Sequence, residues 1–141
     1  MKKIAIIYWS GTGNTQKMAE KIENELSKSG IVVNLFKATE FNSSLIGDYD
    51  GLALGCPAMG AEQLEETEFE PMFLEIKDFL SNKNIALFGS YAWGDGEWMR
   101  NWHKECENAG ANIVCNPVIV NGTPDADCFS KLEKLSQALI A

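Results

Sequence analysis

The amino-acid sequence predicts an α/β fold, with a single doubly wound sheet of five parallel strands and helices on both faces. Five short apolar runs alternate along the chain with segments whose apolar residues recur at helical spacing. This alternation is typical of parallel strands joined by right-handed crossovers. The length of 141 residues, with 45% hydrophobic and 23% charged residues, matches one globular domain over residues 1–141.

The predicted strands are the five apolar runs, because strands that are buried on both faces carry continuous apolar sequence. They cover residues 3–9, 31–36, 50–55, 84–90 and 113–120. The segment 37–47 has neither strand nor helix periodicity. We therefore expect the crossover between the second and third strands to be short or irregular.

Four segments place apolar residues on one stripe of a helix. This spacing predicts helices over 15–29, 65–80, 97–109 and from 123 onward. The stripes are Met18, Ile22 and Leu26, then Phe69, Met72, Phe73, Ile76 and Phe79, then Trp98, Trp102 and Cys106, and last Leu132, Leu135 and Leu139.

Glycine, proline and hydroxyl residues mark the expected helix ends. Gly30 and Gly110 are expected to end the first and third helices. Pro71 fits only near the first turn of the second helix, because an interior proline breaks the hydrogen-bond pattern. Thr123 is the expected cap of the fourth helix, with Pro124 at the first helical position.

Composition excludes several classes of function. The net charge of −8 at pH 7 repels nucleic acid and anionic membranes, and no apolar stretch is long enough to cross a bilayer. The start, Met1 to Ile4, lacks the small-residue cleavage site of a signal peptide, so we expect a cytoplasmic protein. Cysteines at 56, 106, 115 and 128 form no Cys-x-x-Cys pair, so we expect plain thiols and no metal site.

The acidic residues are concentrated in one part of the chain. Between Lys37 and Lys77 there is no Lys or Arg, while Asp and Glu occur nine times, with five glutamates from Glu62 to Glu70. Such a stretch is either a solvated face that keeps the protein in solution or a docking surface for a basic partner. Charge alone favours the solvated face.

The loop after the first predicted strand has the composition of a phosphate-binding loop. Residues 10–15 combine two glycines, three hydroxyls and one amide side chain, and the helix that follows adds free N–H groups and a positive dipole end. The sequence is neither Gly-x-x-x-x-Gly-Lys-Ser/Thr nor Gly-x-Gly-x-x-Gly, since Gln16 stands at the third glycine. No Lys or Arg lies between Lys3 and Lys17, so a bound phosphate keeps its charge. The alternative is a polar helix cap without a ligand.

Two more loops at the same edge of the predicted sheet each carry a large, polarisable side chain. Met59 follows the third strand and Trp93 follows the fourth. Exposing such side chains is costly unless a ligand covers them, and both suit contact with a flat aromatic ring. The alternative is that both side chains lie in the core. Next to a phosphate loop, we favour a planar aromatic ligand between them.

Three segments together resemble the flavodoxin family, specifically the short-chain flavodoxins that bind flavin mononucleotide (FMN). These segments are YWSGTGNT at 8–15, LGCPAMGAEQLEETEFE at 54–70 and LFGSYAWGDGEWMR at 87–100. The resemblance covers essentially the whole chain and implies the strand order 2-1-3-4-5. The fifth strand runs on without the insertion of the long-chain group, which fits the short-chain label.

The resemblance also implies which residues hold FMN. Residues 10–15 are expected to hold the phosphate, Met59 and Trp93 to enclose the ring, and Glu62 to hydrogen-bond its N3 edge. Backbone N–H groups around residues 91–94 are expected at the pyrimidine end. Ala61, where relatives often carry Asp, acts through its backbone. The full set is Ser10, Gly11, Thr12, Gly13, Asn14, Thr15, Ala58, Met59, Gly60, Ala61, Glu62, Ser90, Tyr91, Ala92, Trp93 and Gly94.

The turn Met59 to Glu62 and the charges near it predict the redox behaviour. A type II′ turn needs positive φ at Gly60 and aims the Gly60 carbonyl at the flavin N5, which favours the semiquinone. The uncompensated phosphate and the glutamates of 62–70 disfavour the anionic hydroquinone. We therefore expect a monomeric low-potential one-electron carrier without catalytic residues, moving mainly between semiquinone and hydroquinone. Its expected partners are basic-faced reductases and acceptors that dock around Glu62–Glu70.

One alternative is a flavin-dependent quinone or nitro-compound reductase on the same fold. Such enzymes need a substrate pocket over the ring, whereas Met59 and Trp93 are expected to cover both of its faces. A receiver domain is excluded, because Ser10-Gly11 and Gly55-Cys56 stand where it needs acidic residues. A cysteine phosphatase is excluded, because the single arginine, Arg100, completes no Cys-x5-Arg loop.

Overall fold

One parallel sheet organises residues 2–141, the part of the chain that the computed structural model describes. Its strands are β1 (Lys3–Tyr8), β2 (Val32–Lys37), β3 (Gly51–Gly55), β4 (Asn84–Tyr91), β5 (Asn112–Ile113) and β6 (Val118–Asn121). The order is β2-β1-β3-β4-β5. β6 pairs with the same strand as β5, β4, but closer to the carboxyl end of β4. The strand order is therefore the predicted one, and the carboxyl ends of β1, β3 and β4 lie at one edge of the sheet.

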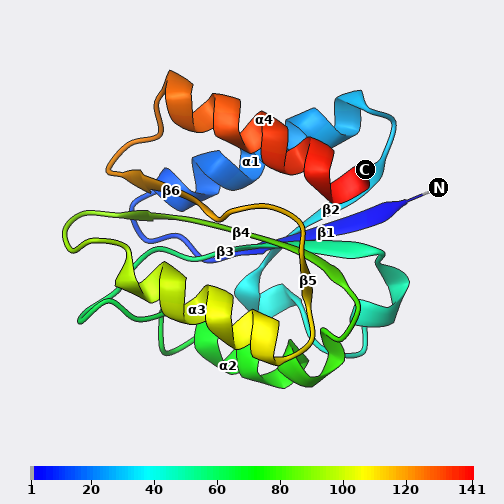
Figure 1. Ribbon diagram of the computed structural model, residues 1–141, viewed down its shortest axis with the longest axis horizontal. Helices are drawn as coiled ribbons and strands as arrows, with labels where there is room; N and C mark the ends of the chain where they lie inside the picture. The colour runs from blue at the N-terminus through cyan, green and yellow to red at the C-terminus, as the bar shows by residue number, and fades with distance from the viewer. Residues whose placement is uncertain (1) are drawn as a thin grey trace.

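Helices cover both faces of this sheet (Figure 1). They are α1 (Asn14–Lys28), α2 (Phe69–Ile76), α3 (Glu97–Asn108) and α4 (Ala126–Ile140). α1 and α4 lie on one face, and α2 and α3 lie on the other. Successive strand residues point to opposite faces, so Ile4 and Ile6 pack with α1 and α4, whereas Ala5 and Ile7 pack on the other side. This arrangement confirms the predicted fold class.

The predicted stripes of all four helices are buried, with one exception. Phe79 is 52% exposed, because α2 ends at Ile76 and the chain continues as the 3₁₀ turn η3 (Lys77–Phe79). A 3₁₀ turn has about 3.0 residues per turn instead of about 3.6. Phe79 therefore leaves the stripe that Phe69 and Phe73 share, and its predicted burial is wrong.

The predicted start of the second helix, at residue 65, is also wrong. Glu65 stays outside α2, and its carboxylate accepts hydrogen bonds from the N–H groups of Thr67, Glu68 and Phe69, each at 2.8 Å. The Thr67 hydroxyl donates to the same carboxylate. These bonds satisfy N–H groups that have no partner within the helix. The helix therefore begins at Phe69, with Pro71 in its first turn as predicted.

The last helix begins with a different cap from the predicted one. The Asp125 carboxylate, rather than the Thr123 hydroxyl, accepts the N–H of Cys128 at 2.9 Å. A carboxylate forms a stronger, charge-assisted bond to a free N–H than a hydroxyl does. α4 consequently begins at Ala126, and Pro124 precedes the helix.

The predicted fifth strand, 113–120, is interrupted. β4 pairs with β5 in the register Ile85 to Ile113, and with β6 in the register Phe88 to Val118. Between these two paired positions the edge strand has four residues, 114–117, whereas β4 has only two, 86 and 87. The edge strand therefore has two extra residues, which leave the sheet. An edge strand has one neighbour and loses few hydrogen bonds by such an excursion, and proline, here Pro117, occurs in sheets at edges and bulges.

The crossover between β2 and β3 is irregular, as predicted. It contains two single 3₁₀ turns, η1 (Ala38–Glu40) and η2 (Ile46–Asp48). Across the described residues, no helix combines the length and the apolar character that crossing a membrane requires.

We expect Glu65→Ala to lower the free energy of unfolding by about 2 kcal/mol, because three backbone N–H groups lose their acceptor. Urea unfolding followed by circular dichroism measures this loss. Glu66→Ala removes the same charge from an exposed neighbour, and we expect it to change the unfolding free energy by less than about 0.5 kcal/mol. Equal losses in the two variants would contradict the role of Glu65.

The same carboxylate gives this prediction a pH dependence. Burial by itself raises the pKa of Glu65, but hydrogen bonds from Thr67, Phe69 and Glu68 outweigh it and hold the pKa below its usual value. The stabilisation is therefore complete above the unfolded pKa and is lost as the pH falls through the folded pKa. We expect the stability difference between the wild type and Glu65→Gln to shrink below about pH 4.

Candidate functional site

Three loops meet at the carboxyl edge of the sheet, after β1, β3 and β4. Together with the end of β6 they form a hollow of about 220 Å³. The residues that line it are Trp9, Gly11, Thr12, Asn14, Pro57, Ala58, Met59, Ser90, Tyr91, Ala92 and Gly122. Ligands of open parallel sheets bind outside the carboxyl ends of the strands, so the hollow lies where a binding site is expected.

The loop between β1 and α1 presents free backbone donors. The Ser10 hydroxyl accepts the N–H groups of Gly13 at 3.1 Å and Gln16 at 3.3 Å, which folds the loop back on itself. The N–H groups of Thr12, Asn14 and Thr15 donate no hydrogen bond to any of residues 2–141. These donors and the positive end of the α1 dipole form a cradle for an anion.

Trp9 forms a fixed wall beside this cradle. Its indole N–H donates to the Glu68 carboxylate at 2.7 Å. A Cβ atom at Gly11 would lie 3.1 Å from the Trp9 ring, so only glycine fits there without displacing the indole. The hydrogen bond from Trp9 to Glu68 holds the loop after β1 against the start of α2.

The loop is also tied to the end of β4. The hydroxyls of Thr15 and Ser90 are both buried and lie 3.0 Å apart. The Thr15 side chain therefore connects the start of α1 to the end of β4, while its backbone N–H stays free for a ligand.

The turn after β3 closes one residue later than predicted. Met59 and Gln63 exchange both backbone hydrogen bonds, at 2.8 and 2.9 Å, so three residues form the turn between them. Gly60 has the predicted positive φ, +52°, and Glu62 also has a positive φ, +53°. The predicted four-residue turn from Met59 to Glu62 is therefore corrected to a five-residue turn that ends at Gln63.

The unusual backbone of Glu62 has a compensating contact. Its carboxylate accepts the N–H groups of Gly96 at 3.1 Å and Glu97 at 3.2 Å, at the start of α3. A Cβ at Gly94, whose φ is +94°, would lie 2.6 Å from that carboxylate. Left-handed backbone costs a non-glycine residue about 1–2 kcal/mol, and two charge-assisted hydrogen bonds offset this cost. Glu62 thus links the loops after β3 and β4.

Acidic side chains lie on the loops that border the hollow. Of the residues that line it, none is Lys or Arg. The carboxylates of Glu62, Asp95 and Glu97 lie within 4.8 Å of one another. Arg100 donates to Asp95 at 3.0 Å, and this bond lowers the pKa of the Asp95 carboxyl. A phosphate in the cradle therefore has dipoles around it but no neutralising cation within the lining.

Known proteins have similar sequences and the same fold. A family model described as Flavodoxin matches residues 6–134. The flavodoxin of Clostridium beijerinckii is 46% identical over 134 residues, which cover 93% of this chain and 97% of that protein. This chain belongs to the flavodoxin family. The Megasphaera elsdenii flavodoxin is 43% identical over 122 residues, which cover 86% of this chain and 88% of that protein. The solution structure of the two-electron reduced form of Megasphaera elsdenii flavodoxin has a TM-score of 0.86 at 40% identity, covering 95% and 98% of the two chains.

Flavodoxins are FMN-binding electron-transfer proteins, so the predicted family, cofactor and general activity are confirmed. The residues at the hollow fit this cofactor. The free N–H groups of Thr12, Asn14 and Thr15 suit a phosphate, and Gly11 leaves room beside Trp9. Met59 and Tyr91 give the hollow a polarisable and aromatic lining.

The predicted site residues fall into two groups in this structure. Eight of them line the hollow: Gly11, Thr12, Asn14, Ala58, Met59, Ser90, Tyr91 and Ala92. The others lie on the same loops outside that lining: Ser10, Gly13, Thr15, Gly60, Ala61, Glu62, Trp93 and Gly94. Their contacts with FMN stay predictions.

The two side chains predicted to enclose the ring lie outside the buried core. Trp93 is 72% exposed and Met59 is half-buried. In contrast, Trp98 and Trp102 are buried in the core, as their helical spacing predicts. An indole with this exposure is available to cover a flat ligand.

Three lining residues are missing from the predicted set: Trp9, Pro57 and Gly122. Trp9 and Pro57 adjoin predicted residues, and the phosphate-type composition begins only at Ser10. Gly122 follows the edge strand β6 and reaches the hollow because the Gly122 N–H donates to the Tyr91 carbonyl at 2.8 Å. Gly122 could have been predicted from its position directly after β6, because β6 ends at the same edge of the sheet as β4.

Proposed function

We propose that this flavodoxin carries single electrons at low potential on non-covalently bound FMN, which moves mainly between the semiquinone and hydroquinone states. The observation that carries the proposal is the charge at the hollow: no cation is in its lining, and Glu62, Asp95 and Glu97 lie close together on the loops that border it. Negative charge added to the cofactor by reduction meets repulsion there. About 1.4 kcal/mol of repulsion lowers a one-electron potential by about 60 mV.

The chain's own groups bind the phosphate without neutralising it. Three backbone N–H groups and a helix dipole supply partial charges only. No thiol lines the hollow, and Cys56, the nearest in sequence, is buried with a raised pKa caused first by that burial. A neutral, buried thiol supports non-covalent attachment. The four free cysteines also support the proposed cytoplasmic setting.

We also propose that basic-faced reductases and acceptors dock on the acidic face around Glu62–Glu70. Glu66 and Glu68 are exposed there, and no Lys or Arg occurs between Lys37 and Lys77. Trp93, on the neighbouring loop, is highly exposed. Opposite charges steer two proteins into contact and raise the association rate.

We expect the FMN-loaded protein to pass through a blue neutral-semiquinone phase when it is reduced stepwise without oxygen. Visible absorption spectra at each step measure this phase. A long blue phase requires that the second electron enter at a clearly lower potential than the first. Bleaching in one step would contradict one-electron transport and favour the two-electron quinone or nitro-compound reductase.

We expect Gly60→Ala to make the oxidised/semiquinone potential more negative, by on the order of 60 mV if the strained φ costs about 1.4 kcal/mol. The physical reason is that the turn expected to aim the Gly60 carbonyl at the flavin N5, and so to favour the semiquinone, needs a positive φ at Gly60. Its φ is +52°, and alanine resists such a conformation. Redox titration with FMN bound measures the potential. Gly47→Ala is the matched control, because a Cβ there meets nothing within 4 Å. An unchanged potential in folded Gly60→Ala would exclude this role of the turn.

We expect electron transfer from the reduced protein to a basic cytochrome c to slow about tenfold or more as salt rises from about 0.02 M to about 0.5 M. Stopped-flow absorbance measures the rate. Glu66→Lys, before the start of α2, is expected to slow the reaction at low salt. Asp78→Lys, an equal charge change in η3 beyond the end of α2, is expected to have little effect. Equal slowing by both variants would rule out docking on the acidic face.

A further inference from the structure

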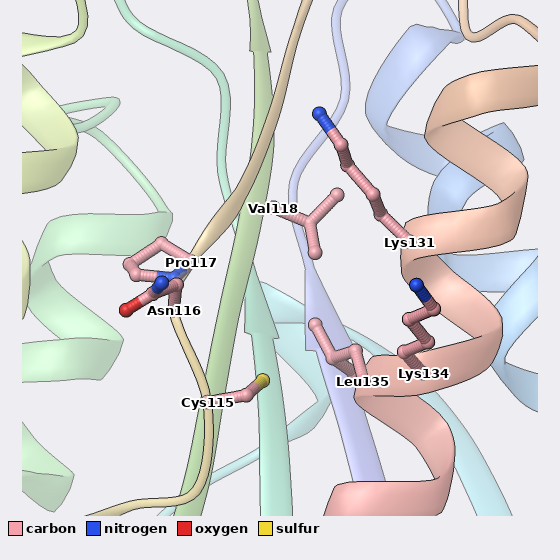
Figure 2. A pocket seen from close by; sticks show the side chains of 7 residues that line it. All are labelled: Cys115, Asn116, Pro117, Val118, Lys131, Lys134 and Leu135. Atoms are coloured by element: carbon pink, nitrogen blue, oxygen red, sulfur yellow. The ribbon is translucent and has the colours of Figure 1, made fainter.

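The interrupted edge of the sheet holds a second, larger hollow. It has a volume of about 420 Å³ and lies between the segment 115–118 and α4 (Figure 2). It shares no lining residue with the hollow at the carboxyl edge. Its ligand chemistry is therefore independent of FMN.

The change of register explains why this hollow exists. Between the pairs Ile85 to Ile113 and Phe88 to Val118, the edge strand has two residues more than β4. The extra residues move away from the sheet, so the edge strand does not fill the space beside α4. Val118 and Leu135, only 5% and 1% exposed, remain as an apolar floor.

The lining combines this floor with cations. Lys131 and Lys134, three residues apart and so on one side of α4, extend beside the hollow, and the Cys115 sulfur points toward Leu135 (Figure 2). Burial raises the pKa of the Cys115 thiol, so at neutral pH it adds apolar surface rather than charge. No Asp or Glu is among the residues that line the hollow.

Both lysines are available to a ligand. Lys134 forms no salt bridge with any described residue. Lys131 pairs with Asp127 at 3.2 Å, but the two side chains are 57% and 77% exposed. Such exposed pairs are weak, so a ligand anion can replace Asp127. The chain has a net charge of −8, so a hollow lined by two cations and no carboxylate differs in charge from the protein as a whole.

We propose that this hollow binds a small amphiphilic anion, a carboxylate on a short apolar chain, with the head between Lys131 and Lys134 and the chain on Val118 and Leu135. The volume lies within the usual range of small-molecule sites. The lining has no aromatic side chain, which distinguishes its ligand from a flavin. The ammonium groups of Lys131 and Lys134 suit the charged head of such a ligand, and Val118 and Leu135 suit its apolar chain.

The test uses hexanoate as the probe and the oxidised, FMN-loaded protein, followed by backbone amide spectra in nuclear magnetic resonance. We expect saturable shifts confined to the backbone amides of residues 114–116, 118 and 131–135. Lys134→Gln is expected to weaken hexanoate binding about fivefold, because one charge-assisted contact is lost. Lys104→Gln, which removes an equal charge from an exposed site on α3, is expected to leave the affinity unchanged.

Two further probes separate the contributions of head and chain. Hexanol has the same chain without charge, and inorganic phosphate has charge without a chain, so both are expected to bind more weakly than hexanoate. Phosphate or hexanol binding as tightly as hexanoate would overturn the proposed ligand class. Absence of shifts at 114–118, shifts at residues 10–15 instead, or equal weakening by Lys104→Gln would overturn the site. None of these outcomes depends on the redox potential of the bound FMN.

Discussion

Burial of the central strands on both faces is the constraint on which the rest of this structure depends. Residues 4–7 of β1, 52–54 of β3 and 85–88 of β4 are fully buried between two helix layers. Polar groups have no place along these strands, because a buried donor or acceptor without a partner is costly. Chemistry that needs free N–H groups is therefore confined to the strand ends. The parallel arrangement brings three such ends to one edge.

At that edge the loops are positioned by contacts to one another. Thr15 bonds to Ser90, Trp9 to Glu68, and Glu62 to the start of α3. The first contact joins the start of α1 to the end of β4, and the other two each join a segment after one strand to a segment after another. The free donors of the first loop are thereby held ready before a ligand arrives, which reduces the ordering cost of binding. Because dipoles rather than lysines hold the phosphate, its negative charge is not neutralised by a cation in the lining. This property links the loop geometry to the proposed low potential.

Much of the fold and of the candidate site was predictable, because periodicity and loop composition report burial directly. The helix ends were less predictable. The caps of α2 and α4 depend on the carboxylates of Glu65 and Asp125, and several nearby residues competed for that role. The positive φ of Glu62 was not predictable, since it depends on N–H groups 34 residues away. Local sequence contains no signal for such a distant contact.

The interruption of the edge strand could not be predicted from the sequence, for a different reason. Side chains alternate with a period of two along a strand, so a two-residue excursion returns every later side chain to its original face. Ile113 and Ile119 accordingly pack with one core, while Val118 and Val120 pack with the other, as in an unbroken strand. The apolar pattern is thus the same with or without the excursion, and Pro117 was the one local sign of it.

Only an edge strand can leave the sheet in this way, because a central strand would lose hydrogen bonds on two sides. The carboxyl ends of the central strands therefore supply the cofactor site, and the edge strand is free to form a second hollow without disturbing it.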